Sequence, residues 1–172
     1  MTTTATMHAL DETTGTVRVE DVYDTDIDDL WQACTTPERL ARWIATVDGD
    51  LRVGGTVRAV FTSTWTGSLR VEACDAPHHL LLAGVDEEGQ IEAWLTKEDS
   101  GTRLVVEDRG LSLEHLPFHA SGWRVHLEDL GRSLEVAGPA HPEGWSSEAG
   151  APRWKSRWEE LTPAYREMEI SR

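Results

Sequence analysis

Two histidines and an aspartate in the second half of the chain are of types that bind metal ions or move protons. His115 and His119 lie four residues apart in the segment EHLPFH, and on a helix this spacing places two imidazoles on one face, as zinc sites require. Pro117 separates them ahead of the expected helix, and a third ligand would have to be Asp108 or His126. The pattern therefore favours ordinary loop histidines, and we expect no metal ion and no cofactor.

Asp108 is the best single candidate for a polar anchor or a general base. It follows Leu104 and Val106 at period two in an expected strand, so its side chain points to their face if the strand continues that far. A carboxylate on a buried face is partly desolvated, which raises its pKa unless Arg109, a histidine or water pairs with it. The alternative is that the strand ends earlier and Asp108 faces solvent.

Other catalytic signatures are missing from the sequence. There is no GxSxG nucleophile motif, and there is no glycine-rich motif of the GxGxxG or GxxxxGK[ST] type that would hold a nucleotide phosphate. The two cysteines lack a CxxC spacing, and Cys34 falls on a helix stripe while Cys74 falls at a strand end. We expect both to be buried or half-buried reduced thiols of a cytosolic protein.

The charge balance limits the partners of the protein. Lys and Arg number 16 and Asp and Glu number 31 in 172 residues, a net charge of −15. Nucleic acids and anionic membrane surfaces both require clustered basic residues, so neither is an expected partner. Residues 11–29 are especially acidic. We expect them to form a solvated face, and the alternative is a docking surface for a basic protein partner.

The sequence contains no sign of export or membrane insertion. No stretch approaches the roughly 20 apolar residues of a membrane-spanning helix. Residues 1–15 lack the charged and apolar regions of a secretory signal. We therefore expect a cytoplasmic protein.

Short alternating segments dominate the first two thirds of the chain. After a frayed start over residues 1–6, Met7–Leu10 is a candidate short strand and Thr16–Tyr23 predicts a longer one. Two short helices follow, over residues 27–34 and 36–44. Residues 111–120 form a loop. Five strands joined by tight turns lie between the second short helix and this loop, at residues 56–63, 67–73, 80–85, 90–96 and 102–108. Their spacing predicts an antiparallel meander.

A long amphipathic helix follows the strands, over residues 121–137. Trp123, Leu127, Leu130 and Leu134 recur at steps of four, three and four, which forms one apolar stripe on a helix. A helix of this kind that follows a run of strands must bury its stripe against the sheet that they form. Glycine and proline at residues 138 and 139 stop it.

The remaining residues, 138–172, form an extension. Residues 139–150 are rich in Pro, Gly and Ser and predict a loose connection. Residues 153–168 show helical spacing, which Pro163 is expected to break or kink.

Eight tryptophans are a further signal of buried or ligand-binding surface. Trp65 ends a strand and Trp94 lies within one, where a large ring either packs in the core or lines a pocket. Trp94 faces outward if the face that carries Ile91 is the interior, and it lines the cavity otherwise. Three others lie on helix inner faces and are expected in the core: Trp31, Trp43 and Trp123.

The order of strand, two short helices, strands and long helix resembles the helix-grip fold of the START/SRPBCC superfamily. Its activator-of-heat-shock-ATPase-like branch is similar over residues 17–137. The similar stretches are DDLWQACTTPERLARW at residues 28–43, Arg52–Gly55, Cys74–Pro77, Gly101–Leu104, and Gly122–Trp123 with the three leucines of the stripe. The resemblance implies an α+β fold in which a curved antiparallel sheet wraps a long helix and leaves a cavity between them.

The resemblance implies no catalytic residues, because the branch has no shared catalytic motif. Two positions near the family's cavity depart from the common pattern. Gly84 stands where many members have a tryptophan, and Asp108 stands where the last strand often ends in a histidine. These departures leave room for a different ligand.

Three functions are compatible with these features. The first is a non-enzymatic protein that binds a small, largely apolar molecule. The second is an enzyme of the polyketide cyclase/aromatase kind, with Asp108 or His119 moving protons. The third is a chaperone-ATPase-activator-like interaction module that docks through residues 11–29. The residues expected to line the cavity are Phe61, Trp65, Trp94, Asp108, His119, Trp123, His126 and Leu127.

We expect one helix-grip domain over residues 1–137, with residues 138–172 packed on it, in a monomer or a homodimer. Trp123, Leu127, Leu130 and Leu134 are then both a packing face and one wall of the cavity, and His126 is the polar side chain beside them.

Overall fold

The computed structural model describes residues 2–172. Eight strands and four α-helices are found in this range, together with one short 3-10 helix, η1. Their bounds are β1 Thr4–Ala9, β2 Thr14–Tyr23, α1 Ile27–Thr35, α2 Pro37–Leu40, β3 Ala45–Gly49, β4 Thr56–Phe61, β5 Thr66–Asp75, β6 His79–Gly84, β7 Gln90–Glu98, β8 Gly101–Ser112, η1 Leu113–His115, α3 Leu116–Val136 and α4 Pro152–Glu167.

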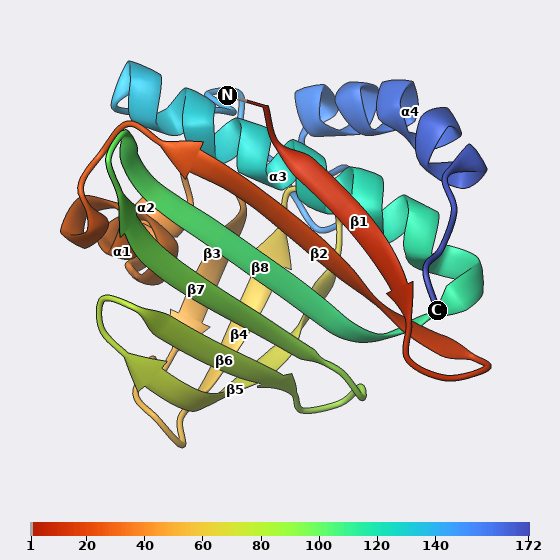
Figure 1. Cartoon of the computed structure of the whole chain (residues 1–172). Coiled ribbons are helices and arrows are strands. Elements are labelled where there is room, and N and C mark those ends of the chain that lie inside the picture. The colour runs from red at the N-terminus through yellow and green to blue at the C-terminus, as the bar shows by residue number, and fades with distance from the viewer. Residues whose placement is uncertain (1) are drawn as a thin grey trace.

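The strands form one antiparallel sheet in the order β1-β2-β8-β7-β6-β5-β4-β3. Consecutive strands pair along the meander from β3 to β8, and β2 adds the β1–β2 hairpin to the meander by pairing with β8. The sheet curves, and α3 lies across it while α4 runs beside α3 (Figure 1). The predicted α+β helix-grip fold is therefore confirmed, with the two short helices between β2 and β3.

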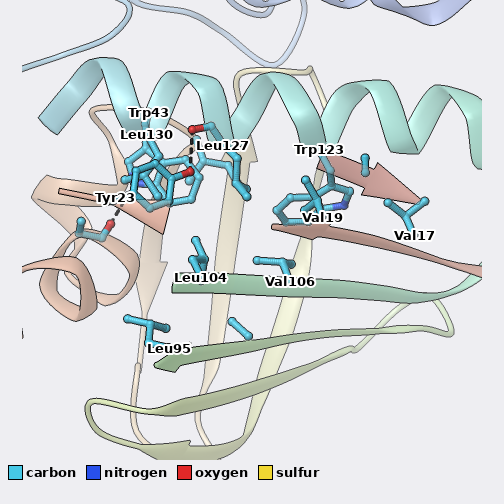
Figure 2. Packing of buried hydrophobic residues seen from close by; sticks show 14 of the residues in the cluster. Val17, Val19, Tyr23, Trp43, Leu95, Leu104, Val106, Trp123, Leu127 and Leu130 are labelled. Atoms are coloured by element: carbon cyan, nitrogen blue, oxygen red, sulfur yellow. Dashed lines mark hydrogen bonds between the residues drawn. The ribbon is translucent and has the colours of Figure 1, made fainter. Parts of the chain in front are cut away.

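The apolar stripe of α3 is buried against the inner face of the sheet, as predicted. Leu127 and Leu130 have no exposed area, and they pack in one cluster with Val19 and Leu104 (Figure 2). The Tyr23 hydroxyl donates a hydrogen bond to the Leu127 carbonyl oxygen at 2.8 Å. This contact ties β2 to α3 at the centre of the core.

Helix α3 begins at Leu116, five residues before the predicted start. The loop predicted for residues 111–120 is wrong throughout, because β8 continues to Ser112, η1 spans Leu113–His115 and α3 follows at once. Pro117 lies in the first turn, where a missing backbone N–H costs nothing because no carbonyl precedes it in the helix. The side chain of Leu116 is fully buried and anchors this end. His119 therefore lies on the helix rather than in a loop.

Helix α4 continues through Pro163, so the predicted break is wrong. The turn before the proline is held by contacts that do not need the missing N–H. The Thr162 hydroxyl donates to the Trp158 carbonyl oxygen at 2.6 Å and also lies 2.9 Å from the Ser121 hydroxyl of α3. Pro163 itself faces solvent, where the carbonyl left without its N–H partner can be hydrated.

The expectation of a frayed start is wrong from Thr3 onward. Thr3 is buried and donates from its hydroxyl to Asp21, and β1 pairs with β2 over its whole length. Ala5 and Met7 are buried and alternate with exposed residues. The segment therefore has the period-two pattern of a strand, although few of its residues are apolar. The strand β1 overlaps the candidate strand Met7–Leu10 and begins earlier, at Thr4, whereas the strand β3 was not predicted.

The cysteines are both free, and Cys34 is half-buried as expected. Burial raises the pKa of the Cys34 thiol to about 12. Cys74 is exposed, which corrects the expectation of a buried or half-buried thiol there. None of the helices within residues 2–172 has both the length and the apolar content needed to span a bilayer.

Candidate functional site

A cavity of about 850 Å³ lies between the inner face of the sheet, the first half of α3 and the start of α4. The turns that join β4 to β5 and β6 to β7 also line it. Eight ring-bearing side chains contribute to its walls: Phe61, Trp65, Phe118, His119, Trp123, His126, Trp154 and Trp158.

Helix α3 presents one face to the cavity. Phe118, His119, Gly122, Trp123 and His126 follow one another at steps of one, three, one and three, which places them on adjacent turns of one side. The missing side chain at Gly122 lets α4 approach, because a Cβ atom there would lie 3.2 Å from the ring of Trp154. This packing brings α4 aromatic rings to the cavity wall.

The turn between β4 and β5 supplies a second wall. Phe61 and Trp65 make an edge-to-face pair with their ring centroids 5.0 Å apart. A Cβ atom at Gly67 would lie 2.6 Å from the Trp65 ring, so the indole lies directly over this glycine. The turn is closed by Thr64 with a φ of 78°, a left-handed conformation that is uncommon for threonine.

Asp108 points to the inner face, as the period-two pattern predicts. It lies on β8 opposite Val17 of β2 and Ile91 of β7, and its Oδ2 accepts a hydrogen bond from Trp123 Nε1 at 2.8 Å. Burial raises the pKa of Asp108 to about 6, against the opposing effects of the Trp123 hydrogen bond and the Arg109 charge. The site thus contains a carboxyl group that changes charge near neutral pH.

Replacing Asp108 with asparagine should change the pH dependence of stability. The folded pKa of about 6 lies above the ordinary value of 3.8. Asp108 therefore holds its proton more tightly in the folded protein than in the unfolded chain, and protonation stabilises the fold. This stabilisation is complete below pH 3.8 and is lost as the pH rises through about 6. Urea unfolding of both proteins from about pH 4 to pH 7.5 measures the effect. The free energy of unfolding of wild type relative to Asp108→Asn should fall over this interval, and a flat or rising difference would contradict the assignment.

His126 lies in an aromatic enclosure at the inner end of the cavity. Its ring centroid is 5.7 Å from Phe61, 5.5 Å from Trp123 and 5.3 Å from Trp154, and its Nδ1 lies 3.4 Å from the buried hydroxyl of Thr62. Burial lowers the pKa of His126 to about 3. The imidazole is therefore neutral at physiological pH and offers a hydrogen-bonding group without charge.

Six of the eight predicted cavity residues line the cavity, and two do not. Leu127 is fully buried in the core beside the cavity, so its prediction as a lining residue is wrong. Trp94 is on the opposite face of the sheet, because Ala93 and Leu95 point inward and side chains alternate along a strand. It lies in a shallow outer groove beside Arg109, and its prediction as a lining residue is also wrong.

Sequence reasoning missed the contribution of α4 and of the first turn of α3. Trp154 and Trp158 were recognised as part of a helical pattern but were not assigned to the cavity, because the sequence does not show which way the extension folds back. Phe118 was placed in a loop. The steps of four residues from Phe118 to Gly122 and from Gly122 to His126 were the available sign that all three lie on one helix face.

The two histidines with zinc-like spacing diverge in the structure. His115 is exposed at the end of η1, whereas His119 is half-buried on α3 and lines the cavity. Burial, and then the neighbouring His115, lower the pKa of His119. In the part of the chain that the structure describes, no three His, Cys, Asp or Glu side chains converge as metal ligands would.

Comparison with solved structures shows this fold in other proteins. CalU16 from Micromonospora echinospora has a TM-score of 0.73 at 23% sequence identity, covering 96% of this chain and 97% of CalU16. Ms6760 from Mycobacterium smegmatis has a TM-score of 0.61 at 23% identity, covering 78% of this chain and 99% of Ms6760. DynU16, described as a protein of the dynemicin biosynthetic locus, has a TM-score of 0.66 at 26% identity, covering 73% of this chain and 49% of DynU16.

Sequence comparison identifies the family. No curated protein matches the chain. The family model described as "Activator of Hsp90 ATPase homolog 1-like protein" matches residues 24–135, a span that runs from the end of β2 to the last turn of α3. Since this match covers more than half of the sequence, the chain belongs to the Activator of Hsp90 ATPase homolog 1-like family.

Proposed function

We propose that this protein binds a small, largely apolar or aromatic molecule in the cavity between the sheet and helices α3 and α4. The observation that carries the proposal is the cavity itself. Its volume of about 850 Å³ suits a drug-sized molecule. Four of the eight tryptophans of the chain line it, and indole rings supply large apolar area at low conformational cost.

A few polar groups among these rings would orient the ligand. Asp108 accepts from Trp123 through Oδ2 and, among the described residues, its Oδ1 has no hydrogen-bond partner. His126 offers a neutral imidazole. A mostly apolar pocket with a small number of convergent polar groups is the usual form of a small-molecule site.

An enzyme of the cyclase/aromatase kind is the second candidate. The observation in its favour is the pKa of Asp108, about 6, which is suited to a general base near neutral pH. DynU16, at 26% identity, belongs to a biosynthetic locus. If the protein is an enzyme, Asp108→Asn should abolish turnover and spare part of the binding. If it only binds, the variant alters affinity alone.

An interaction module that docks through the acidic residues 11–29 has weaker support. Several of these acids serve the local structure. Asp11 accepts hydrogen bonds from Thr13 and Thr14 in the β1–β2 turn, and Asp26 caps α1 by accepting from the Asp29 backbone N–H at 2.8 Å. These contacts support the interpretation of a solvated and helix-capping face.

Quenching of tryptophan fluorescence by a panel of lipids and aromatic compounds, with native mass spectrometry, tests the binding proposal. Trp65→Ala removes one cavity wall and should weaken binding of any ligand found by about tenfold. Trp94→Ala is the matched control, because Trp94 lies on the outer face. It should leave affinity within about twofold of wild type. Equal losses in both variants, or no ligand in the panel, would count against the proposal.

A further inference from the structure

The carboxylate of Asp108 faces the cavity without a cationic partner. Its one hydrogen bond comes from the neutral indole of Trp123 at 2.8 Å, and none of the ion pairs found within residues 2–172 includes it. Asp108 is half-buried, and a partly desolvated carboxylate without a cationic partner is less stable than one beside a positive charge. With its pKa at about 6, most Asp108 side chains are nevertheless ionised at pH 7.5.

The neighbouring groups do not form an ion pair with Asp108, although the charge of Arg109 lowers its pKa. Arg109, the next residue along β8, is held on the outer face by Glu92 at 2.6 Å and Glu107 at 2.9 Å. On α3, burial lowers the pKa of both His119 and His126, so both imidazoles are neutral at pH 7.5. The residues opposite Asp108 on β2 and β7 are apolar.

The rim of the cavity is also acidic. The β6–β7 turn contributes Asp86, Glu87 and Glu88, and the segment before α4 contributes Glu148. Three basic residues also line the cavity: Arg58 of β4 and Lys155 of α4, both exposed, and Arg109 of β8, whose guanidinium is already paired with Glu92 and Glu107. A cleft lined mainly by one sign of charge raises the local concentration of the opposite sign. Aromatic faces, indole best of all, attract cations as well.

We infer that the cavity selects molecules that carry a cationic nitrogen on an apolar or aromatic frame, with the cation seated beside the Asp108 carboxylate and the frame among the tryptophans. This inference rests on the proposed function, since it names the class of ligand for the same cavity. It assigns Asp108 the role of counter-ion, and it assigns the acidic rim the role of drawing cations toward the opening.

Three probes that share one ring system test the inference: 2-naphthylmethyl-trimethylammonium, 2-naphthylmethanol and 2-naphthoate. Dissociation constants are measured by calorimetry at pH 7.5 and moderate salt. The cation should bind about tenfold or more tightly than the neutral alcohol, and the anion should bind most weakly. In Asp108→Asn the preference for the cation over the alcohol should shrink to within about twofold. Asparagine can still accept the Trp123 hydrogen bond, and a melting curve of the variant checks its fold.

The matched control removes a negative charge elsewhere. Asp99 lies on the exposed turn between β7 and β8, at the opposite end of both strands from the cavity opening. Asp99→Asn should keep the full preference of wild type, which separates a local counter-ion from the net charge of −15.

The outcomes separate this inference from the proposed function. If the alcohol binds as well as the cation, or the naphthoate binds best, the counter-ion inference is overturned while ligand binding stands. An unchanged cation preference in Asp108→Asn likewise overturns it. If none of the three probes binds and the wider panel is also empty, the proposed function itself fails.

Discussion

Replacing Leu127 with alanine is expected to lower the free energy of unfolding by about 3–5 kcal/mol. Leu127 has no exposed area and lies where α3 crosses the sheet, in the same cluster as Tyr23 and Leu104 (Figure 2). The hydrogen bond from Tyr23 uses the Leu127 backbone and survives the change. The loss is therefore that of buried side-chain contacts and of the void left behind. Urea unfolding monitored by circular dichroism measures it.

Val136 provides the control on the same helix. Its side chain is 58% exposed in the last turn of α3, so Val136→Ala should change the free energy of unfolding by no more than about 0.5 kcal/mol. A loss below about 1.5 kcal/mol for Leu127→Ala would show that the centre of α3 is loosely packed. That result would mean that the cavity reaches Leu127, which is assigned here to the core.

The second large effect is expected at His141. Its Nε2 lies 2.7 Å from Asp129 Oδ2 of α3, and both side chains are almost completely buried. Removing the imidazole leaves the Asp129 carboxyl buried without this partner, which should cost about 3 kcal/mol. His115→Ala, at an exposed histidine, is the control and should be nearly neutral.

This variant also tests how the C-terminal extension is joined to the rest of the chain. We propose that residues 138–172 form one folding unit with residues 1–137. Backbone contacts support this, since the Ala140 N–H donates to the Arg42 carbonyl oxygen at 2.7 Å and the Ala151 N–H donates to that of Thr62 at 2.8 Å. His141→Ala should therefore shift a single cooperative transition. A separate early transition for the extension would contradict the proposal.

The parts of the fold that follow from local periodicity could be predicted from the sequence. The stripe through Trp123, Leu127 and Leu130 required a helix packed on a sheet, and tight turns between alternating segments required an antiparallel meander. Period two along β8 also placed Asp108 on the face of Leu104 and Val106. These inferences depend on residues close in the chain, whose side-chain directions are set by the element that contains them.

The remaining errors arise where tertiary contacts decide. Pro163 does not end α4, because Thr162 anchors that turn to Ser121 of α3. The polar strand β1 forms because β2 offers it a complete pairing edge. Which face of the sheet carries Trp94 becomes clear only once Ala93 is known to point inward. The position of Trp154 in the cavity wall depends on how the extension folds back.

Residue-resolved NMR of the indole N–H groups, titrated with 2-naphthylmethanol, tests the central claim most directly. The eight indole signals are assigned by single Trp→Phe variants. Binding in the cavity predicts saturable shifts at Trp65 and at Trp123, whose N–H donates to Asp108, with no shift at Trp94 on the outer face. Shifts at Trp94 with those of Trp65 and Trp123 unchanged would contradict the claim that this cavity is a ligand-binding site. So would the absence of any indole shift with this probe, with the trimethylammonium probe and with the compounds of the panel.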